Sequence, residues 1–491
     1  MSTQDSTASK NLANIISHCK EYGFIFPSSE IYDGLSAVYD YGQWGVELKK
    51  NIKDLWWKSM VYMHENIVGI DSAIFMHPTI WKASGHVDNF SDPMIDNLDS
   101  KKRYRVDHLI EAYAEQVSGG ESLNEEGQAV IAQMEALLAK DDFAGLKQLI
   151  LDKKMTCSVS GTCNWTDVRQ FNLMFSTQLG SVAEESDTIY LRPETAQGIF
   201  VNFINVQKSG RMKVPFGIAQ IGKAFRNEIV ARGFIFRMRE FEQMEMQYFV
   251  RPGTQKTWYE YWKEARMKWH LELGIPVERY RFHDHVKLAH YADAACDIEY
   301  DFPMGFKEVE GIHSRTDFDL TQHQTYSKKK IQYFDNDIDE ATGKPFGNYT
   351  PYVIETSIGL DRCILMCLSE AYCEEDLSTP EKQDSRVVLK FPPKIAPIKL
   401  AVLPLMKKDG LPEKARELMD HCRDSFLCFY EEKDSIGKRY RRMDALGTPF
   451  CVTIDHQSLE DNTVTIRFRD SMEQERIPME EVKDRVLASL R

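Results

Sequence analysis

The chain has 491 residues, and its 75 acidic and 61 basic side chains give a formal net charge of −14. Hydrophobic residues make up 43% and charged residues 28% of the sequence, which is typical of a soluble globular protein of about three domains. No apolar run is long enough to span a membrane, and the acidic balance argues against a general nucleic-acid coat, although not against a local basic patch. Ten cysteines without a framework spacing predict reduced thiols in a cytosol.

The N-terminal part of the chain predicts a tail, a turn and a helix. Met1–Lys10 is polar and lacks an apolar core, so we expect a frayed tail and no secretory signal. An amphipathic segment follows, and the glycines of Tyr39–Gly45 then mark a turn. Val46–Met60 is predicted to be a helix whose apolar face carries Val46, Ile52, Leu55, Trp56 and Met60.

Residues 109–165 differ in amino-acid composition from the rest of the chain and are predicted to be a helical insertion. Two apolar stripes recur at helical spacing, one through Met134, Leu137 and Leu138 and one through Leu146, Leu149 and Ile150. Cys157 and Cys163 follow at a spacing of six with no second pair nearby, which makes a poor zinc site and favours structural thiols.

Residues 220–228 and 241–250 are both predicted to be strands, and the dozen or so residues between them predict an antiparallel hairpin with a long loop. In the first strand the small residues Gly222 and Ala224 share a face with Arg226 and Glu228, which leaves room for a ligand. In the second strand one face is apolar and is expected to be core. It carries Met244, Met246, Tyr248 and Val250, and Glu242 is the one polar exception on it. The other face is expected to be the floor of a site: Phe241, Gln243, Glu245, Gln247 and Phe249.

The rest of the chain predicts further catalytic-domain elements and a separate C-terminal domain. Residues 252–290 are expected to be helical and residues 328–350 a polar loop or lid. Val353–Arg362 predicts a strand ending at Gly359, followed by an apolar helix. Phe391–Pro397 predicts a linker. Beyond it, a buried strand and alternating helices and strands predict an α/β domain of about 95 residues.

That last domain carries a dense basic cluster, which consists of Lys438, Arg439, Tyr440, Arg441 and Arg442. Basic groups attract phosphate, and an aromatic ring or guanidinium can stack on an unpaired base. A solvated helix face is the alternative interpretation of the same pattern.

The two-strand segment resembles motif 2 of the class II aminoacyl-tRNA synthetases, whose pattern is Arg-x-Glu, a loop and Arg-x-x-x-Phe. On that resemblance Arg226 holds the α-phosphate of ATP and the substrate carboxylate, because a guanidinium matches both bidentately. Glu228 accepts from the adenine amino group, Arg237 holds the outer phosphates and Phe241 stacks under the adenine. The alternative is a solvated hairpin with ordinary surface salt bridges.

Gly359-Leu360-Asp361-Arg362 resembles motif 3 of the same family. The resemblance implies that Arg362 covers the open face of the adenine by cation–π stacking. It implies catalytic roles for Arg226, Glu228 and Arg362. The implied ATP-binding set is Arg226, Asn227, Glu228, Phe236, Arg237, Met238, Arg239, Glu240, Phe241, Glu308, Val309, Gly359, Leu360, Asp361 and Arg362. A carboxylate is expected to hold magnesium with the ATP. Glu308 is the candidate, and Glu310 and Glu355 remain open as alternatives.

Four longer motifs resemble the dimeric glycyl-tRNA synthetases: Tyr39–Gly42, Leu191–Gly198, Phe241–Glu245 and Glu355–Ser357. The likeness runs from about Gly23 to the C-terminus and covers residues 109–165 poorly. Thr356 departs from the proline common in relatives. The resemblance implies that acids pair with the ammonium of glycine. The implied glycine-binding set is Arg105, Glu194, Phe241, Glu242, Gln243, Met244, Glu245, Glu355, Thr356, Ser357, Ile358 and Gly359.

The sequence and the resemblance together predict an α+β protein with a class II antiparallel sheet flanked by helices. The Val46–Met60 helix occupies the place of motif 1, the dimer interface in this family, and a helix buried within one monomer is the alternative. The expected domains are 1–108 with motif 1, the insertion 109–165, the catalytic core 166–390, the linker 391–397 and an anticodon-binding domain 398–491. The implied activity is a cytoplasmic, homodimeric glycine–tRNA ligase that uses ATP with Mg²⁺ and acts on tRNA-Gly, without contact to a membrane. The resemblance implies RNA contacts for Lys438, Arg439, Arg441 and Arg442.

Three further expectations bound this interpretation. No zinc is expected, because no His/Cys cluster lies near the motifs in the sequence. Another class II specificity, such as threonine, proline or serine, is one alternative. A synthetase-like RNA-binding subunit without catalysis is the other, and it is disfavoured because Arg226, Arg237 and Arg362 are all present.

Overall fold

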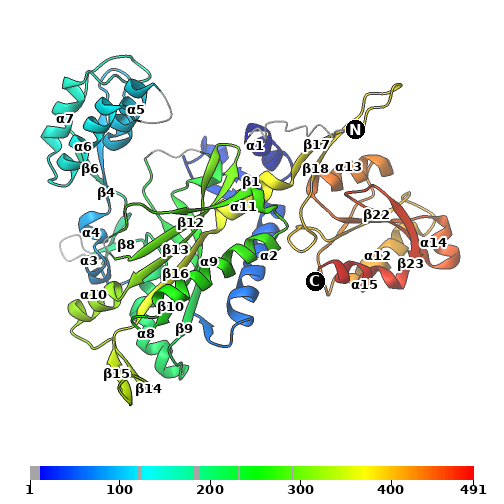
Figure 1. Cartoon of the computed structure of the whole chain (residues 1–491). Helices are drawn as coiled ribbons and strands as arrows, with labels where there is room; N and C mark the ends of the chain where they lie inside the picture. The colour runs from blue at the N-terminus through cyan, green and yellow to red at the C-terminus, as the bar shows by residue number, and fades with distance from the viewer. Residues whose placement is uncertain (1–11, 120–122, 181–186, 230–232, 290, 491) are drawn as a thin grey trace. The chain divides into compact units, whose positions relative to one another are not determined.

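The computed structural model describes residues 12–119, 123–180, 187–229, 233–289 and 291–490, so the predicted tail Met1–Lys10 lies outside the described residues (Figure 1). The chain divides into two compact units. One consists of Met1–Ala73, Glu194–Lys223 and Arg232–Arg491, and the other of Ile74–Pro193 and Ala224–Ala231.

A seven-stranded sheet organises the first unit (Figure 1). Its strands, in spatial order, are β11 (Tyr280–Asp284), β12 (Ala294–Phe302), β13 (Gly305–Thr316), β16 (Tyr352–Gly359), β10 (Glu240–Val250), β9 (Phe216–Phe225) and β3 (Ile67–Gly69). The pairs from β11 to β10 are antiparallel, and β3 pairs in parallel with β9. The predicted antiparallel sheet is therefore confirmed.

The two faces of β10 differ as its alternation predicts. Met244, Met246, Tyr248 and Val250 are buried in the main core, where helices α9 (Gln255–Glu272) and α11 (Leu360–Ala371) cover the sheet. The opposite face carries polar residues at its centre and ends in Phe249, which packs on helix α8 (Ala196–Ser209). Helices α9 and α11 thus cover one face, and the other carries the polar residues.

The N-terminal segment supports this sheet through helix α2 (Gln43–Trp57) and the π-helical turn η2 (Lys58–Tyr62). Ile52, Trp56 and Met60 are fully buried as predicted, but Val46 is 49% exposed and does not join the apolar face. The elements before α2 are α1 (Leu12–Glu21), β1 (Ile25–Pro27), η1 (Glu30–Tyr32) and β2 (Tyr39–Tyr41).

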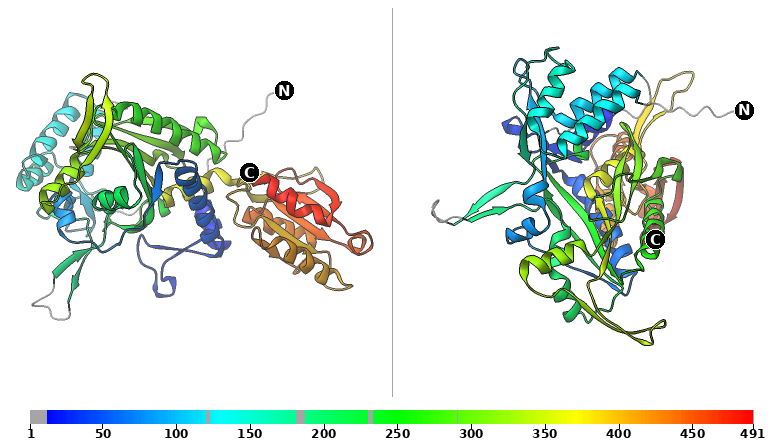
Figure 2. Two further views of the ribbon diagram at one scale, coloured as in Figure 1. Left: turned by 90° about the horizontal axis from the view of Figure 1, so that it is seen from below. Right: turned by 60° about the vertical axis from the view of Figure 1, so that its left-hand side comes forward.

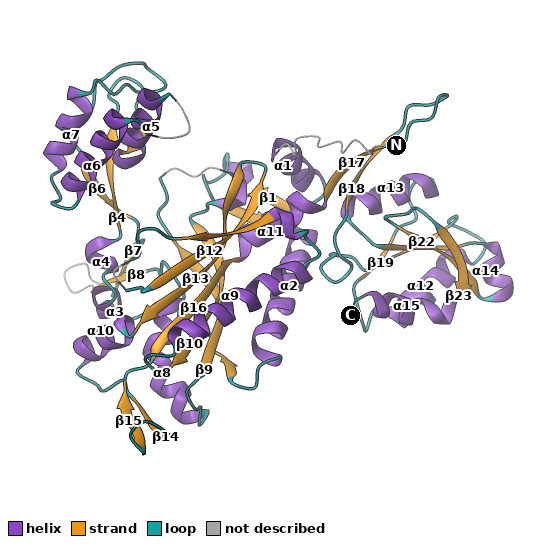
Figure 3. Ribbon diagram, in the orientation of Figure 1, coloured by secondary structure: helices purple, strands orange, loops and turns teal. Residues whose placement is uncertain are grey.

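Three of the predicted elements are wrong. The helix predicted for 252–290 ends at Glu272, and η4 (Val277–Arg279) and the edge strand β11 follow. The loop predicted for 328–350 follows helix α10 (Phe318–Ser327) and contains a hairpin of β14 (Tyr333–Asp339) and β15 (Lys344–Tyr349), visible in Figure 3. The strand predicted to reach Glu228 ends at Phe225, so Arg226 and Glu228 lie beyond it.

The second unit contains the predicted helical insertion, whose three helices pack together (Figure 2, cyan). Met134, Leu146, Leu149 and Ile150 are buried in its core, which confirms both stripes, while Leu137 and Leu138 lie at its margin. Cys157 is buried, and all ten cysteines, which fall within the described residues, are free thiols. The elements are α3 (Thr79–Ala83), α4 (His86–Asn89), β4 (Ser91–Asp96), β5 (Arg103–Arg105), α5 (Val106–Ser118), α6 (Glu125–Leu138), α7 (Phe143–Asp152), β6 (Arg169–Asn172), β7 (Ser176–Leu179) and β8 (Asp187–Tyr190).

The C-terminal part of the chain forms the predicted α/β fold, a five-stranded sheet in the order β20-β19-β21-β22-β23. The predicted linker before it is packed, because the buried ammonium of Lys399 donates to the carbonyls of Pro393, Lys394 and Ala396 at 2.8–2.9 Å. The elements are β17 (Tyr372–Asp376), β18 (Ser385–Leu389), β19 (Leu400–Pro404), α12 (Leu411–Cys422), β20 (Cys428–Tyr430), α13 (Ile436–Leu446), β21 (Phe450–Ile454), α14 (His456–Asp461), β22 (Thr463–Phe468), β23 (Gln474–Pro478), η5 (Met479–Glu481) and α15 (Val482–Ser489).

Candidate active site

A buried acidic cluster lies on the polar face of the central sheet. Strands β10 and β16 pair so that Glu245 is opposite Ser357 and Gln247 is opposite Glu355. The amide nitrogen of Gln247 donates to Glu245 Oε1 at 2.6 Å and to Glu355 Oε1 at 2.8 Å. The register of two strands therefore brings together glutamates that are more than a hundred residues apart in the sequence.

The charge of Glu355 is compensated inside the protein. Arg315 Nη1 donates to both Glu355 oxygens at 2.9 and 3.1 Å, and His313 Nδ1 lies 2.7 Å from Oε2. Burial acts to raise the pKa of Glu355, but Arg315 and His313 outweigh it and hold that pKa far below its ordinary value. Glu355 is therefore ionised and firmly held.

Glu245 is in the opposite electrostatic situation, because no cation compensates it among the described residues. It accepts from Thr195 Oγ1 at 2.5 Å and from Gln247, which are neutral donors. Burial, and next the negative charges of Glu355 and Glu194, raise the pKa of Glu245 well above its ordinary value. A cation placed beside Glu245 would relieve this repulsion and favour its ionised form.

Two buried acceptors on this face also lack partners. The amide nitrogen of Gln243 donates to Ser357 Oγ, and that of Gln247 donates to the two glutamates. The Oε1 atoms of both glutamines have no hydrogen-bond partner among the described residues. An unsatisfied buried acceptor costs about 1–3 kcal/mol, so these oxygens favour a ligand that donates hydrogen bonds. An ammonium group has three donors and a positive charge, which suits two amide oxygens and the uncompensated Glu245.

Glu194 reaches the same cluster from the start of helix α8. Gln197 Nε2 donates to Glu194 Oε1 at 2.9 Å and to Asp319 Oδ1 at 3.0 Å, and Asp319 in turn pairs with Arg315. The structure thus unites five residues of the predicted glycine set, which are Glu194, Gln243, Glu245, Glu355 and Ser357.

Four other members of that set, all in the first unit, have side chains that do not point to this face. Glu242 points to the opposite side of β10, where its carboxylate pairs with Lys49 at 2.9 Å and Lys53 at 3.0 Å. Met244, Thr356 and Ile358 occupy buried positions on the core side of the sheet, so their side chains are not in the acidic cluster. Arg105 belongs to the second unit, where it pairs with Asp107 and Asp92.

The predicted nucleotide residues at the end of β16 are partly assembled. The Arg362 guanidinium carbon lies 4.4 Å from the ring centroid of Phe236, and Nη1 pairs with Glu308 Oε2 at 3.0 Å. A guanidinium stacked on a ring at the start of α11 is suited to stacking on adenine. Phe241, Arg237, Arg239 and Glu240 are partly exposed near the start of β10, and Gly359 ends β16.

Four side chains in the predicted nucleotide set point elsewhere. Val309, Leu360 and Met238 are buried in the main core. Asp361 accepts from Tyr41 Oη at 2.5 Å and from the backbone N–H of Glu242 at 2.8 Å, on the core side of the sheet. These positions can meet a nucleotide only through their backbone.

The motif 2 residues beyond β9 belong to the second unit. Arg226 Nε donates to the carbonyl of Pro193 at 3.0 Å, and its guanidinium lies 5.5 Å from the ring of Phe90. The backbone N–H of Asn227 bonds to the carbonyl of Leu173 at 2.8 Å, and Glu228 follows it. Backbone contacts, and not strand pairing, therefore position this Arg-x-Glu segment.

The three carboxylates considered for magnesium have different environments. Glu310 is buried on the core side and pairs with Arg266 at 2.6 Å and with His270 at 2.8 Å. Glu355 is held by Arg315 and His313. The side chain of Glu308 is 47% exposed beside Arg362, so its oxygens suit a hydrated hard cation.

The basic cluster lies on helix α13, but its members differ. Arg439 is buried and donates to the carbonyls of Pro404 and Glu431 at 2.7 and 3.0 Å, so its predicted RNA contact is wrong and its role is to hold the domain together. Lys438 is exposed. Arg441 pairs with Asp384 at 2.9 Å, and Arg442 pairs with Glu431 and Asp434.

Comparison with known proteins gives the family. The class II core domain of tRNA synthetases (G, H, P, S and T) matches residues 175–371, the glycyl-tRNA synthetase insertion domain 1 matches 92–173, and the anticodon binding domain matches 399–489. A glycine–tRNA ligase from Chlorobaculum tepidum is 54% identical over 95% of this chain and 97% of its own length. The chain belongs to the glycine–tRNA ligase family.

Two further family members show the same extent of similarity. The glycine–tRNA ligase from Treponema denticola is 49% identical over 98% of this chain and 97% of its own length. The glycine–tRNA ligase from Borreliella burgdorferi is 52% identical over 95% of this chain and 94% of its own length. The similarity includes the insertion, which the sequence resemblance covered poorly. In the described part of the chain, no helix combines the length and apolar character needed to cross a bilayer.

Sequence reasoning missed three contributors to the site. Arg315 and Asp319 form the buried ion pair behind Glu355, and His313 bonds to the same carboxylate. The segment Arg315-Thr316-Asp317 was visible in the sequence, but nothing in its spacing indicates a partner forty residues away. No His/Cys cluster lies near the motifs along the sequence, but the fold brings His285 and His313 together with Asp297.

Proposed function

We propose that the chain activates glycine with ATP and transfers it to tRNA-Gly. The acidic cluster on the sheet carries this proposal, since Glu245, Gln243 and Gln247 together offer a cation site with two unsatisfied acceptors. The glycine carboxylate attacks the α-phosphate of ATP, pyrophosphate leaves, and the terminal ribose hydroxyl of the tRNA then attacks the glycyl carbonyl and displaces AMP.

The protein supplies positioning and charge in both steps. Arg226 holds the glycine carboxylate and the α-phosphate, Glu228 accepts from the adenine amino group, and Phe241 and Arg362 enclose the adenine. Glu194, Glu245 and Ser357 hold the substrate ammonium. Positioning of this kind and electrostatic stabilisation of the transition state account for most of the rate in phosphoryl-group chemistry.

We expect selectivity for glycine to come from protein atoms close to the α-carbon, which would exclude every larger side chain. Adding a methyl group to a filled site costs about 1–3 kcal/mol, so alanine binds more weakly than glycine. A divalent cation accompanies ATP in this family. Glu308 fits Mg²⁺ because it offers exposed carboxylate oxygens, and bound Mg²⁺ neutralises charge on the phosphates.

The assembly and the location are also proposals. We place the chain in the cytoplasm as a homodimer, with residues 39–60 as part of the interface. Tyr62 and Met63, at the end of η2, are 74% and 70% exposed, which leaves apolar surface next to this segment. The domain boundaries 1–108, 109–165, 166–390, 391–397 and 398–491 remain our division of the chain.

Amino-acid-dependent ATP–pyrophosphate exchange tests the activity directly. Glycine alone among the twenty amino acids is expected to support exchange, and exchange with threonine, proline or serine instead of glycine would identify the rival specificity. Absence of exchange with every amino acid would support the inactive RNA-binding subunit.

Glu245→Gln is expected to raise the KM for glycine by about 10–100-fold while changing the KM for ATP little, because a hydrogen bond to a charged group contributes about 1.5–3 kcal/mol. The measurement is exchange at varied glycine and at varied ATP. Glu264→Gln, an exposed position on α9, is the matched control and should match the wild type. If the substitution changed only the KM for ATP, the ammonium site would have to lie elsewhere.

Changing Arg441 and Arg442 together to alanine is expected to weaken tRNA binding and to flatten its dependence on salt, because fewer counterions are released. Pyrophosphate exchange without tRNA should stay unchanged. The measurement is aminoacylation at several salt concentrations, with Arg423→Ala on the end of α12 as control. Equal losses in aminoacylation and in exchange would show that these arginines support the fold and do not contact RNA.

A further inference from the structure

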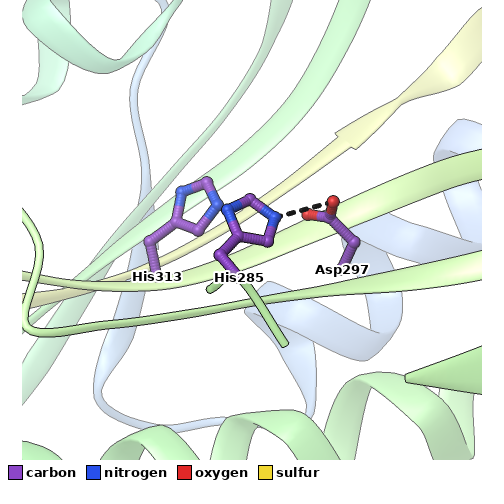
Figure 4. Close-up of side chains that lie close together, drawn as sticks. All are labelled: His285, Asp297 and His313. Atoms are coloured by element: carbon purple, nitrogen blue, oxygen red, sulfur yellow. Dashed lines mark hydrogen bonds and ion pairs between the residues drawn. The ribbon is translucent and has the colours of Figure 1, made fainter. Parts of the chain in front are cut away.

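Two histidines and an aspartate meet on the polar face of the sheet, near its β11 edge (Figure 4). His285 follows β11, Asp297 lies on β12 and His313 lies on β13. Their candidate ligand atoms all lie within 4.8 Å of one another. We propose that His285, Asp297 and His313 form a binding site for a divalent transition-metal ion of the zinc type, distinct from the magnesium that accompanies ATP.

The strand register explains how three separated residues converge. Asp297 is opposite Gly311, and Ala295 is opposite His313. The backbone N–H of His285 extends the β11–β12 pairing to the carbonyl of Ala295, which places small Ala295 between the two histidines. Their ring centroids are consequently 5.8 Å apart, and His285 Nε2 lies 2.8 Å from Asp297 Oδ2.

Space for an ion is provided by Gly311. A Cβ atom at this position would lie 3.1 Å from His313 Nε2 and 3.6 Å from Asp297 Oδ1, so any larger residue would fill the room between two of the three ligands. A cavity of about 390 Å³ lined by His285, Tyr291 and His313 adjoins them. Ligand atoms of a tetrahedral zinc ion are about 3.4 Å apart, since the bonds are about 2.0–2.2 Å long. Small side-chain rotations are therefore enough to form the site.

The partner of His313 supports the same conclusion. His313 Nδ1 lies 2.7 Å from Glu355 Oε2, so this nitrogen donates to the carboxylate and Nε2 is left to bind the ion. A carboxylate that orients a metal-binding histidine is a recurrent arrangement in zinc proteins. The same bond joins the proposed ion to the acidic cluster through Glu355.

The donor set selects the class of metal. Imidazole nitrogen suits Zn²⁺ and its neighbours in the first transition series, whereas Mg²⁺ prefers oxygen donors and octahedral geometry. Three protein ligands leave a fourth position open, which is the arrangement of zinc sites that also bind water or another small ligand.

The test is zinc binding by the full chain after chelator treatment and desalting. Titration against a chromophoric competitor is expected to show one tight zinc ion per chain that excess Mg²⁺ does not displace. Replacing the zinc with Co²⁺ should give the intense visible absorption of a four-coordinate ion. Failure of the wild type to bind zinc tightly, or displacement of the zinc by Mg²⁺, would overturn the proposal.

Variants separate this site from other histidines. His285→Ala and Asp297→Asn are each expected to weaken zinc binding by more than about 100-fold, since even the loss of an outer-shell partner costs 10–100-fold. His283→Ala is the matched control, because His283 lies on β11 beside the site but bonds to Glu299. Unchanged binding in either ligand variant would refute the assignment. Should a variant fail to fold, anomalous diffraction from zinc-loaded wild-type crystals decides the question, because the expected peak lies among the three side chains and a peak elsewhere contradicts it.

Discussion

Arg226→Ala is expected to lower glycine-dependent pyrophosphate exchange by about 10²–10³-fold, because removing one preoriented donor to a developing charge has that effect in other enzymes. The hydrogen bond from Arg226 Nε to the carbonyl of Pro193 fixes the plane of the guanidinium. A charged fork held in this way supports the transition state without reorganising during the reaction.

Two comparisons make the result specific. Arg226→Lys keeps the charge but loses the fork, so it should recover only part of the activity. Arg169→Ala, at an exposed position in the same unit, is the control and should retain full exchange. If Arg226→Ala exchanged pyrophosphate at nearly the wild-type rate, the motif 2 assignment would be wrong.

Local periodicity predicted those elements that local residues determine. The alternation of β10 separates core methionines from a polar floor, and the structure confirms this division except at Phe249, which is buried in a second apolar core. The stripes of the insertion helices also met in one core. The hairpin of β14 and β15 escaped prediction because distant partners stabilise it. Arg251 lies 3.6 Å from the ring of Phe346 and bonds to Asp335, and neither contact leaves a periodic trace.

The same limit applies to the site. Glu194 and Glu245 could be found because they belong to continuous motifs, whereas the environment of each carboxylate depends on strand register. Register places His313 and Glu355 opposite each other, and the turn from β13 into α10 brings Asp319 to Arg315. Register also places Thr356 and Ile358 on the wrong face for a ligand, although they are adjacent to Ser357 in the sequence.

Arg315→Leu is expected to destabilise the protein by about 3–5 kcal/mol, which is the usual cost of removing one member of a buried ion pair. Arg315 is buried and donates to Glu355 and Asp319, so its loss leaves two carboxylates without their cation. The measurement is the shift of the urea midpoint. Arg281→Leu is the control, since Arg281 is 51% exposed where it pairs with Glu299, and an exposed pair contributes only about 0–1 kcal/mol.

A double variant distinguishes loss of charge compensation from loss of packing. If uncompensated charge causes the destabilisation, adding Glu355→Gln to Arg315→Leu should recover part of the lost stability, because one of the two stranded charges is removed. If lost packing causes it, the second change should add its own cost and recover nothing. A midpoint for Arg315→Leu equal to that of Arg281→Leu would show that the pair does not support the fold. The acidic cluster would then owe its geometry to the strands alone.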